Sequence, residues 1–222
     1  MVPQQRSHQR KKPRQARSIE TEARILEAAG QVLADHGYLG CSTSRIADAA
    51  GISKGSIYQY FADKDEVLTA LAAKLADEIT QAIGKAIDGG LGDDWQSLAA
   101  AVLSASFHAL ERRGEMLRPL FVEAPHIKLA VMITDVVTRA EDVGRTYIAL
   151  NPGEFRRDLD VDAVMYVLVT MLESVLTDYV SAATTIPRER LTDTLMAVLA
   201  RTLTNDPAEN DPAEPAPSSR LA

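Results

Sequence analysis

The chain has 222 residues, of which 46% are hydrophobic and 25% charged, and it carries a formal net charge of −7. This size and apolar content suffice for a buried core and one or two domains, and the charge excludes a protein that is basic over its whole surface. Because there is one cysteine, an internal disulfide is excluded.

The charge is distributed unevenly along the chain. Residues 1–65 contain ten basic and seven acidic side chains, a net charge of +3, so the remaining residues carry −10. This polarity predicts a polyanionic partner at the N-terminal end only.

The first segment, residues 1–18, is polar and basic without hydrophobic periodicity, and it predicts a disordered arm. Its six basic side chains could follow the groove of a nucleic acid or belong to a solvated tail, and the sequence favours neither. No apolar run follows the arm, so we do not expect a secretory signal.

Helical periodicity begins at Ser18, a candidate N-cap, and Gly37 is placed to end this first helix. A second short helix is expected over 42–50 and a third over 54–61, separated by a tight turn at Gly51–Ser53. Two short helices joined by a glycine-containing turn are the parts of a helix-turn-helix motif, here about 42–61.

The rest of the chain also has helical periodicity. Asp63 and Glu66 have the spacing of a capping box, which predicts a long helix ending near Gly89. Further helices are expected over 93–113, 115–123, 126–150, 160–183 and 188–204, with Asp160 or Asp162 capping the fourth of these. The fold class is therefore all-α.

The last segment, residues 205–222, is acidic and proline-rich and predicts a disordered tail. The two most apolar segments, 97–110 and 163–172, are shorter than the roughly 18 residues that a membrane span needs, so no membrane contact is expected. These features, together with the single cysteine, fit a cytoplasmic protein.

The third helix has an unusual outer face. On a helical projection of 54–61, Ile57 and Phe61 share one side, while Gly55 and Gln59 lie on the other. Hydrogen-bonding and aromatic groups beside a glycine suit a helix that enters the DNA major groove. The alternative is a pair of short helices in an ordinary helical protein.

The run from 19 to 79 resembles the N-terminal domain of the tetracycline-repressor (TetR) family. The resemblance rests on the first-helix pattern over Ala28–Gly37, "IADAAGIS" at Ile46–Ser53, "KGSIYQYF" at Lys54–Phe61 and "KDEVL" at Lys64–Leu68. This combination is far more specific than a bare helix-turn-helix pattern.

The resemblance implies a two-domain, ligand-responsive transcriptional regulator that is not an enzyme. Residues 19–79 would bind a pseudo-palindromic double-stranded DNA operator, and 80–204 would bind a small-molecule effector and form a homodimer through the helices near 160–183 and 188–204. Effector binding would release the DNA, and the protein is expected to be a repressor. No cofactor is implied.

The resemblance assigns phosphate contacts to the beginning of each short helix and to the segment after them. Thr43, Ser44 and Arg45 match the start of the family's second helix, which contacts phosphate and sometimes a base. Lys54 and Lys64 match two lysines that contact the DNA backbone.

The same comparison assigns sequence reading to the third helix. Gly55 and Ser56 match positions close to base edges, and Gln59 matches the variable residue that adds specificity. Tyr58 would contact a phosphate or a thymine methyl group. Tyr60 stands where many members have histidine, and the resemblance implies the same phosphate contact for it.

The effector pocket is expected to be lined by aromatic, methionine and histidine side chains of the C-terminal half, although such residues are more often core. The candidates are Trp95, Phe107, His108, Met116, Phe121, Met132, Tyr147 and Tyr166. Glu173 and Asp178 interrupt an apolar helix and are expected to face solvent. Glu123 and His126 have a spacing compatible with metal ligands, but no metal site is expected.

Two other functions are compatible with parts of the sequence. A protein of the same fold could bind DNA without operator preference and without an effector. An all-helical enzyme is the remote alternative, since the sequence has no nucleophile–base pair, glycine-rich phosphate loop or dense metal-ligand cluster.

Overall fold

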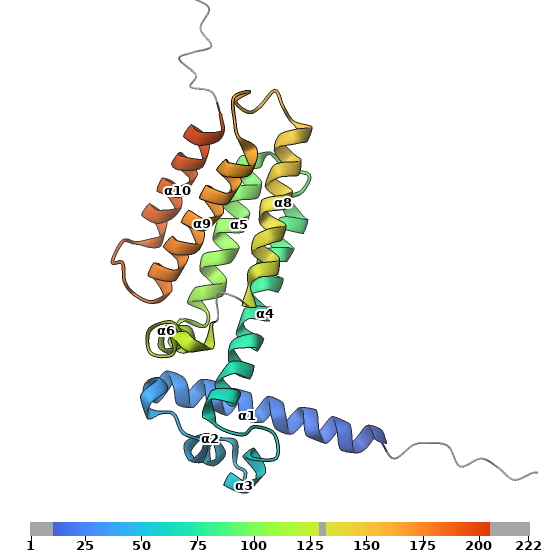
Figure 1. Ribbon diagram of the computed structural model, residues 1–222, viewed down its shortest axis with the longest axis vertical. Helices are drawn as coiled ribbons and strands as arrows, with labels where there is room; N and C mark the ends of the chain where they lie inside the picture. The colour runs from blue at the N-terminus through green and yellow to red at the C-terminus, as the bar shows by residue number, and fades with distance from the viewer. Residues whose placement is uncertain (1–10, 129–131, 205–222) are drawn as a thin grey trace, which may run out of the picture.

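The computed structural model describes residues 11–128 and 132–204, and every secondary-structure element in these ranges is a helix. The all-α prediction is confirmed. Three N-terminal helices form a head, and α4 rises from this head into a body of roughly parallel helices (Figure 1). The predicted tail, 205–222, lies outside the described residues.

The head consists of α1 (Lys11–Gly40), α2 (Thr43–Ala50) and α3 (Lys54–Ile57). Its core is apolar, and the exposed fractions of Ile46, Ile57 and Phe61 are 0%, 0% and 6%. Burial of these side chains, which is the main stabilising term in a small helical unit, holds the two short helices against α1.

The predicted arm needs a correction, because α1 begins at Lys11 rather than Ser18. Lysine, arginine, glutamine and alanine are good helix formers, and Pro13 falls in the first turn, where its missing N–H costs no hydrogen bond. Residues 1–10 lie outside the described part. At the other end, Gly37 leaves helical geometry with φ 66°, and one further turn reaches Gly40.

The third helix is shorter than predicted. It ends at Ile57 instead of Phe61, because the N–H groups of Gln59 and Tyr60 donate to carbonyls three residues back, as in a tightened last turn. The chain nevertheless keeps a helical sense to Phe61, whose N–H donates to the Ile57 carbonyl at 2.9 Å.

The helices α4 (Lys64–Gly90), α5 (Trp95–Glu111) and α6 (Gly114–Val122) follow the predicted ranges closely. Asp63 accepts a hydrogen bond from the Glu66 N–H at 2.9 Å as the spacing predicts, whereas the Glu66 carboxylate accepts from the N–H of Ala62, one residue before the N-cap. α4 continues past residue 79 without a break, so head and body share one rigid helix.

The predicted helix over 126–150 needs a second correction. Residues Pro125–Ile127 form a short 3₁₀ helix, η1, and Lys128 at φ 51° ends it. The α-helix α8 then spans Thr134–Leu150. A residue in the left-handed conformation cannot continue a right-handed helix, so the predicted helix is interrupted at Lys128.

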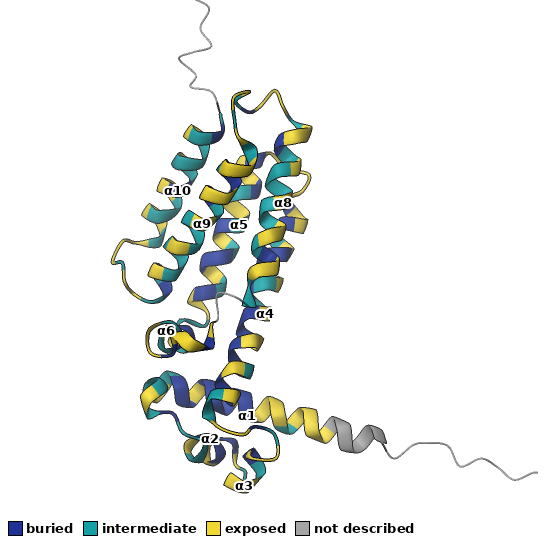
Figure 2. Ribbon diagram, in the orientation of Figure 1, coloured by how far each residue is buried: buried dark blue, intermediate teal, exposed yellow. Residues whose placement is uncertain are grey.

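The last two helices are α9 (Val161–Val180) and α10 (Arg188–Leu203). Asp160, one of the two predicted caps, accepts from the Ala163 N–H at 3.1 Å. In Figure 2, buried positions recur along α4 and α5, whereas α9 and α10 are mostly intermediate or exposed with a few buried positions.

α9 is longer than the apolar segment, 163–172, on which the membrane expectation was based. Among the described residues it is the one helix that is long and apolar enough to cross a bilayer by length and composition, although little of it is buried in the monomer. The sequence estimate considered only 163–172, and the helix extends beyond that segment at both ends. An apolar helix that a second protein chain covers meets the same criterion.

Candidate nucleic-acid interface

Capping interactions fix the two short helices of the head. Ser42 accepts from the Arg45 N–H at 3.3 Å at the start of α2, and Gly51 ends that helix at φ 64°, a conformation that favours glycine. Arg24 of α1 donates to the Ala50 carbonyl at 2.5 Å. α2 is thus held at both ends before any ligand is present.

The outer face of α3 is open. Lys54, Gly55, Tyr58 and Gln59 are exposed, whereas Ile57 beneath them is fully buried. At the start of the helix, the Ser53 hydroxyl accepts from the Ser56 N–H at 3.1 Å. The lysine, tyrosine and glutamine side chains therefore project from a helix whose own position is fixed.

Gly55 has no internal reason to be glycine. A Cβ added there would meet only the Ser53 hydroxyl oxygen, at 3.8 Å, and its φ is not in the left-handed region. Glycine in a helix costs roughly 0.5–1 kcal/mol relative to alanine. The backbone of α3 at Gly55 is therefore open to close approach by another surface.

The other predicted DNA contacts differ in their exposure and in the internal hydrogen bonds that hold their side chains. The Thr43 and Tyr58 hydroxyls are 3.3 Å apart, which joins the start of α2 to the end of α3. Arg45 is exposed and donates to the Gly40 carbonyl at 2.9 Å, whereas Ser44 and Tyr60 are half-buried. Ser56 is half-buried as well, and its hydroxyl lies 2.8 Å from that of Ser53.

Lys64 makes internal contacts instead of projecting freely. Its Nζ donates to the Tyr38 carbonyl at 3.2 Å and lies 3.8 Å from the centroid of the Tyr38 ring. The Tyr38 hydroxyl donates to Asp65 at 3.0 Å. Burial, followed by this hydrogen bond, raises the pKa of Tyr38, so the phenol stays protonated and remains a donor.

Sequence reasoning missed the contact between this cluster and the body. Glu123, directly after α6, accepts from the backbone N–H groups of Tyr38 at 3.0 Å and Leu39 at 3.3 Å. His126 Nε2 lies 3.4 Å from Asp65 Oδ2. The Glu123/His126 spacing, considered above for a metal, thus brings two side chains onto the head, and no sequence signal reveals their partners because those lie more than 60 residues away.

Two neighbouring cavities of the body are lined largely by apolar side chains. The first, the apolar cavity, has a volume of about 160 Å³ and lies between α4, α5, α8, α9 and α10. Trp95, Tyr147 and Phe155 lie at one end of it, with ring centroids of Tyr147 and Phe155 6.1 Å apart. The second, the mixed cavity, measures about 400 Å³ and is lined by α4, α5, α6, α8 and α9.

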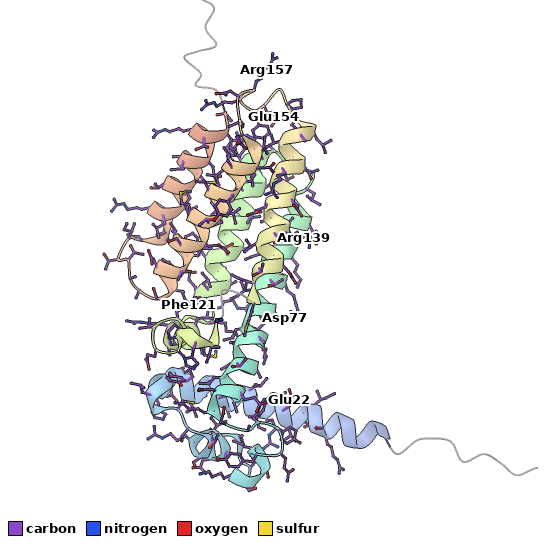
Figure 3. The ribbon with its side chains drawn as sticks, viewed as in Figure 1. Glu22, Asp77, Phe121, Arg139, Glu154 and Arg157 are labelled. Carbon is purple, nitrogen blue, oxygen red and sulfur yellow. The ribbon has the colours of Figure 1, made fainter. Side chains whose placement is uncertain are left out.

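Three of the eight candidate pocket residues line these cavities. Trp95 and Tyr147 line the apolar cavity, and Phe121 lines the mixed cavity from α6 (Figure 3). The other five candidates do not line either of these two cavities: Phe107, His108, Met116, Met132 and Tyr166.

Each of these five has another environment. Phe107 is fully buried against Tyr179, and Met116 and Met132 pack against the large core that joins head and body. His108 is exposed, with its Nδ1 3.2 Å from Arg188, and Tyr166 is 63% exposed on α9.

Glu173, which we expected to face solvent, is half-buried and lines the mixed cavity, whereas Asp178 is exposed at its edge. Burial, followed by repulsion from Glu141, raises the pKa of Glu173. Elsewhere, burial raises the pKa of the Cys41 thiol, which disfavours the reactive thiolate. No group of three or more potential metal ligands occurs within 11–128 and 132–204.

A helix-turn-helix head with an open face on α3, continuous through α4 with a cavity-containing body and also contacted by Glu123 and His126, is the architecture of a helix-turn-helix DNA-binding protein. Residues 25–71 match the family model described as "Bacterial regulatory proteins, tetR family". The chain belongs to the TetR family of DNA-binding transcriptional regulators, which are not enzymes.

Individual relatives support this assignment over much of the chain. The transcriptional repressor AcnR of Corynebacterium efficiens is 25% identical over 178 residues, covering 75% of this chain and 86% of the relative. The transcriptional activator FasR of Mycolicibacterium smegmatis is 32% identical over 126 residues, covering 54% of this chain and 57% of FasR.

The fold extends to solved structures. FadR of Bacillus subtilis, solved in complex with stearoyl-CoA, matches with a TM-score of 0.58 and 21% identity, covering 81% of this chain and 97% of that one. At this identity the likeness concerns the fold alone.

Proposed function

We propose that this regulator binds a pseudo-palindromic operator as a homodimer, acts as a repressor, and is released by a small-molecule effector. The observation that carries the DNA-binding part is the face of α3, where exposed Lys54, Gly55, Tyr58 and Gln59 lie directly over buried Ile57. AcnR, which aligns with 75% of this chain, is named a repressor. A protein that binds genomic DNA in this way acts in the cytoplasm of a bacterium.

The exposed side chains suggest a division of roles within the interface. Gln59, with a free amide, is placed to read a base edge, and Gly55 lets the helix backbone approach closely. Lys54, Tyr58 and Thr43 are placed to contact phosphate, the last two as a hydroxyl pair.

The remaining predicted contacts divide further. Arg45 and Ser44 at the start of α2 complete the phosphate contacts, with Tyr60 beside them. Ser56 can reach a base only by exchanging its bond with Ser53. Because Lys64 is held by Tyr38, we assign it a mainly positioning role within the head.

The dimer would form through α9 and α10. Tyr166 and Val167 on α9 are 63% and 60% exposed, an unfavourable arrangement for apolar side chains unless a partner covers them. This also accounts for the length and apolar character of α9. In the DNA-binding state, the two recognition helices should be about 34 Å apart, which is one turn of B-DNA.

The effector would bind in the body, within the predicted domain 80–204, and act on the head, within 19–79. Phe121 lines the mixed cavity, and Glu123, two residues further on, bonds to the backbone of Tyr38 and Leu39 in the head. A ligand that moves α6 therefore acts on the orientation of the head. FadR of Bacillus subtilis, which shares the fold, was solved with stearoyl-CoA, and only the long apolar part of that ligand is compatible with the apolar walls of this body.

Selection of bound sequences from a random DNA pool, followed by footprinting of the selected site, tests the proposal. We expect enrichment of an inverted repeat with half-site centres about one helical turn apart, and protection that requires a dimer. Retention of DNA without any enriched motif would favour the alternative of a nonspecific DNA-binding protein and would contradict the proposal.

A further inference from the structure

The two body cavities adjoin each other. Four residues line both of them and form a thin partition: Val102 of α5, Ala140 of α8, and Val169 and Leu172 of α9. All four are small or aliphatic side chains, and connecting the two volumes would require a different rotamer of Val169 or Leu172. A ligand longer than either cavity could then occupy both.

The apolar cavity accepts only an apolar group. The residues that line it are aliphatic, aromatic or methionine, apart from Gly144, and none of them is charged. Its polar groups are the Trp95 indole N–H and the Tyr147 hydroxyl, and the hydroxyl already donates to the Asp93 carbonyl at 3.1 Å. Burying a polar head here would cost several kcal/mol without a compensating hydrogen bond.

The mixed cavity has a different character on its α9 side. Thr170, Glu173, Ser174, Thr177 and Asp178 line it there, and none of its described lining residues is basic. This side is therefore suited to a group that donates hydrogen bonds or carries positive charge, and it repels an anion.

The carboxylates of Glu173 and Asp178 both line this cavity without a side-chain partner among the described residues, and Glu173 is the more buried of the two. It forms no hydrogen bond or ion pair with another described residue, whereas its neighbour Glu141 is paired with Arg145 at 3.1 Å. Partial burial raises the pKa of Glu173, which means that its carboxylate is poorly solvated and would be stabilised by a cation.

We propose that the effector is an elongated cationic amphiphile, whose positive head lies against Glu173 and whose apolar chain crosses the partition into the apolar cavity. This inference rests on the proposed function, since it names the chemical class of the effector. Anionic amphiphiles, including acyl-CoA, would be rejected by the two carboxylates on α9.

Trp95 makes the chain insertion directly observable. It is the only tryptophan of the protein and it lines the apolar cavity, whereas the proposed head-group site at Glu173 lines the mixed cavity. We would titrate the full-length protein with decyltrimethylammonium, decanoate and decan-1-ol, follow Trp95 fluorescence, and use tetramethylammonium as a head group without a chain.

The expected order of affinity follows from the charges. Decyltrimethylammonium should bind about tenfold or more tightly than decan-1-ol, and decanoate should bind most weakly, because each tenfold step needs only about 1.4 kcal/mol of head-group interaction. Tetramethylammonium should leave Trp95 fluorescence unchanged. Equal binding of decanoate and decyltrimethylammonium would overturn the proposal.

Two variants separate head from chain. Glu173→Gln should lower the affinity for decyltrimethylammonium about tenfold and leave decan-1-ol unaffected, whereas Ala99→Phe, which fills the apolar cavity, should weaken both. Glu22→Gln, an exposed carboxylate on α1, is the matched control and should change neither (Figure 3). Unchanged cation binding in Glu173→Gln would refute the assignment of the head site.

Footprinting on the selected operator distinguishes failure of the proposed effector class from failure of the proposed function as a DNA-binding regulator. If the operator is protected but none of the decyl compounds binds, the effector class is wrong and the regulator remains. If no site is protected, the proposed function fails even where amphiphiles bind. If decyltrimethylammonium binds and removes protection, both stand.

Discussion

Gly55→Ala separates the stability of the head from its affinity for DNA. The added Cβ would contact only the Ser53 hydroxyl oxygen at 3.8 Å, so the folded head accommodates it without strain. Replacing glycine by alanine in a helix stabilises by up to about 1 kcal/mol. In a chain of this length we therefore expect Tm to stay constant or rise by about 2–4 °C.

Operator binding should change in the opposite direction. The new methyl group occupies space that the DNA must approach, and it moves Gln59 and its neighbours away from the base edges. Losing one well-formed base contact costs about 1–3 kcal/mol, which is roughly 5- to 150-fold in Kd. Fluorescence anisotropy with the selected operator measures this loss, and thermal denaturation measures stability on the same preparation.

Gly89→Ala provides the matched control. This glycine lies near the end of α4, is exposed, and has no heavy atom within 4 Å of an added Cβ. It should show a comparable stability gain with unchanged operator affinity. If Gly55→Ala bound the operator as tightly as the wild type, the close approach of α3 to DNA would be refuted, and a lower Tm would refute the stability argument.

Four further changes test separate parts of the reasoning. Lys54→Ala should weaken selected and random DNA alike and reduce the slope of log K against log salt by about 1, as measured by salt-dependent titration. Gln59→Ala should instead relax preference at one base position per half-site, visible in a repeated sequence selection; an unaltered motif would argue against its reading role. Glu123→Gln keeps a hydrogen-bond acceptor for the Tyr38 and Leu39 N–H groups but removes its negative charge. The free energy of unfolding, measured by chemical denaturation, should therefore fall by about 1 kcal/mol. In an effector titration, the variant should release less DNA than the wild type. The raised pKa of Glu173 means that wild-type stability falls as the pH rises from the unfolded to the folded pKa of this group. Glu173→Gln should therefore raise Tm at pH 7 and give no gain below pH ~4. An equal gain in Tm at both pH values would contradict this.

The sequence determined the local elements that depend on neighbouring residues. Asp63 with Glu66, and Asp160 before α9, cap helices as their spacing predicts, because a cap needs only three or four consecutive residues. The burial of Ile46, Ile57 and Phe61 also followed from helical spacing, since a short amphipathic helix has one side to bury.

Helix ends without such signals were predicted less well. α3 ended one turn early, and α8 began later than expected because Lys128 adopts a left-handed conformation that no residue type at that position announces. The start of α1 at Lys11 shows the converse, since good helix formers extended a helix through a segment whose charge suggested disorder.

Only the tertiary structure decided which distant side chains meet. Glu123 on the backbone of Tyr38, and Lys64 on the ring of Tyr38, depend on how α6 and α4 pack against the head. The same holds for the cavities, because a lining residue differs from a core residue only in whether a neighbouring helix fills the space beside it. The family motifs and the exposed face of α3 thus follow from contiguous residues, whereas the partition near Glu173 exists only because α5, α8 and α9 leave space on both sides of it.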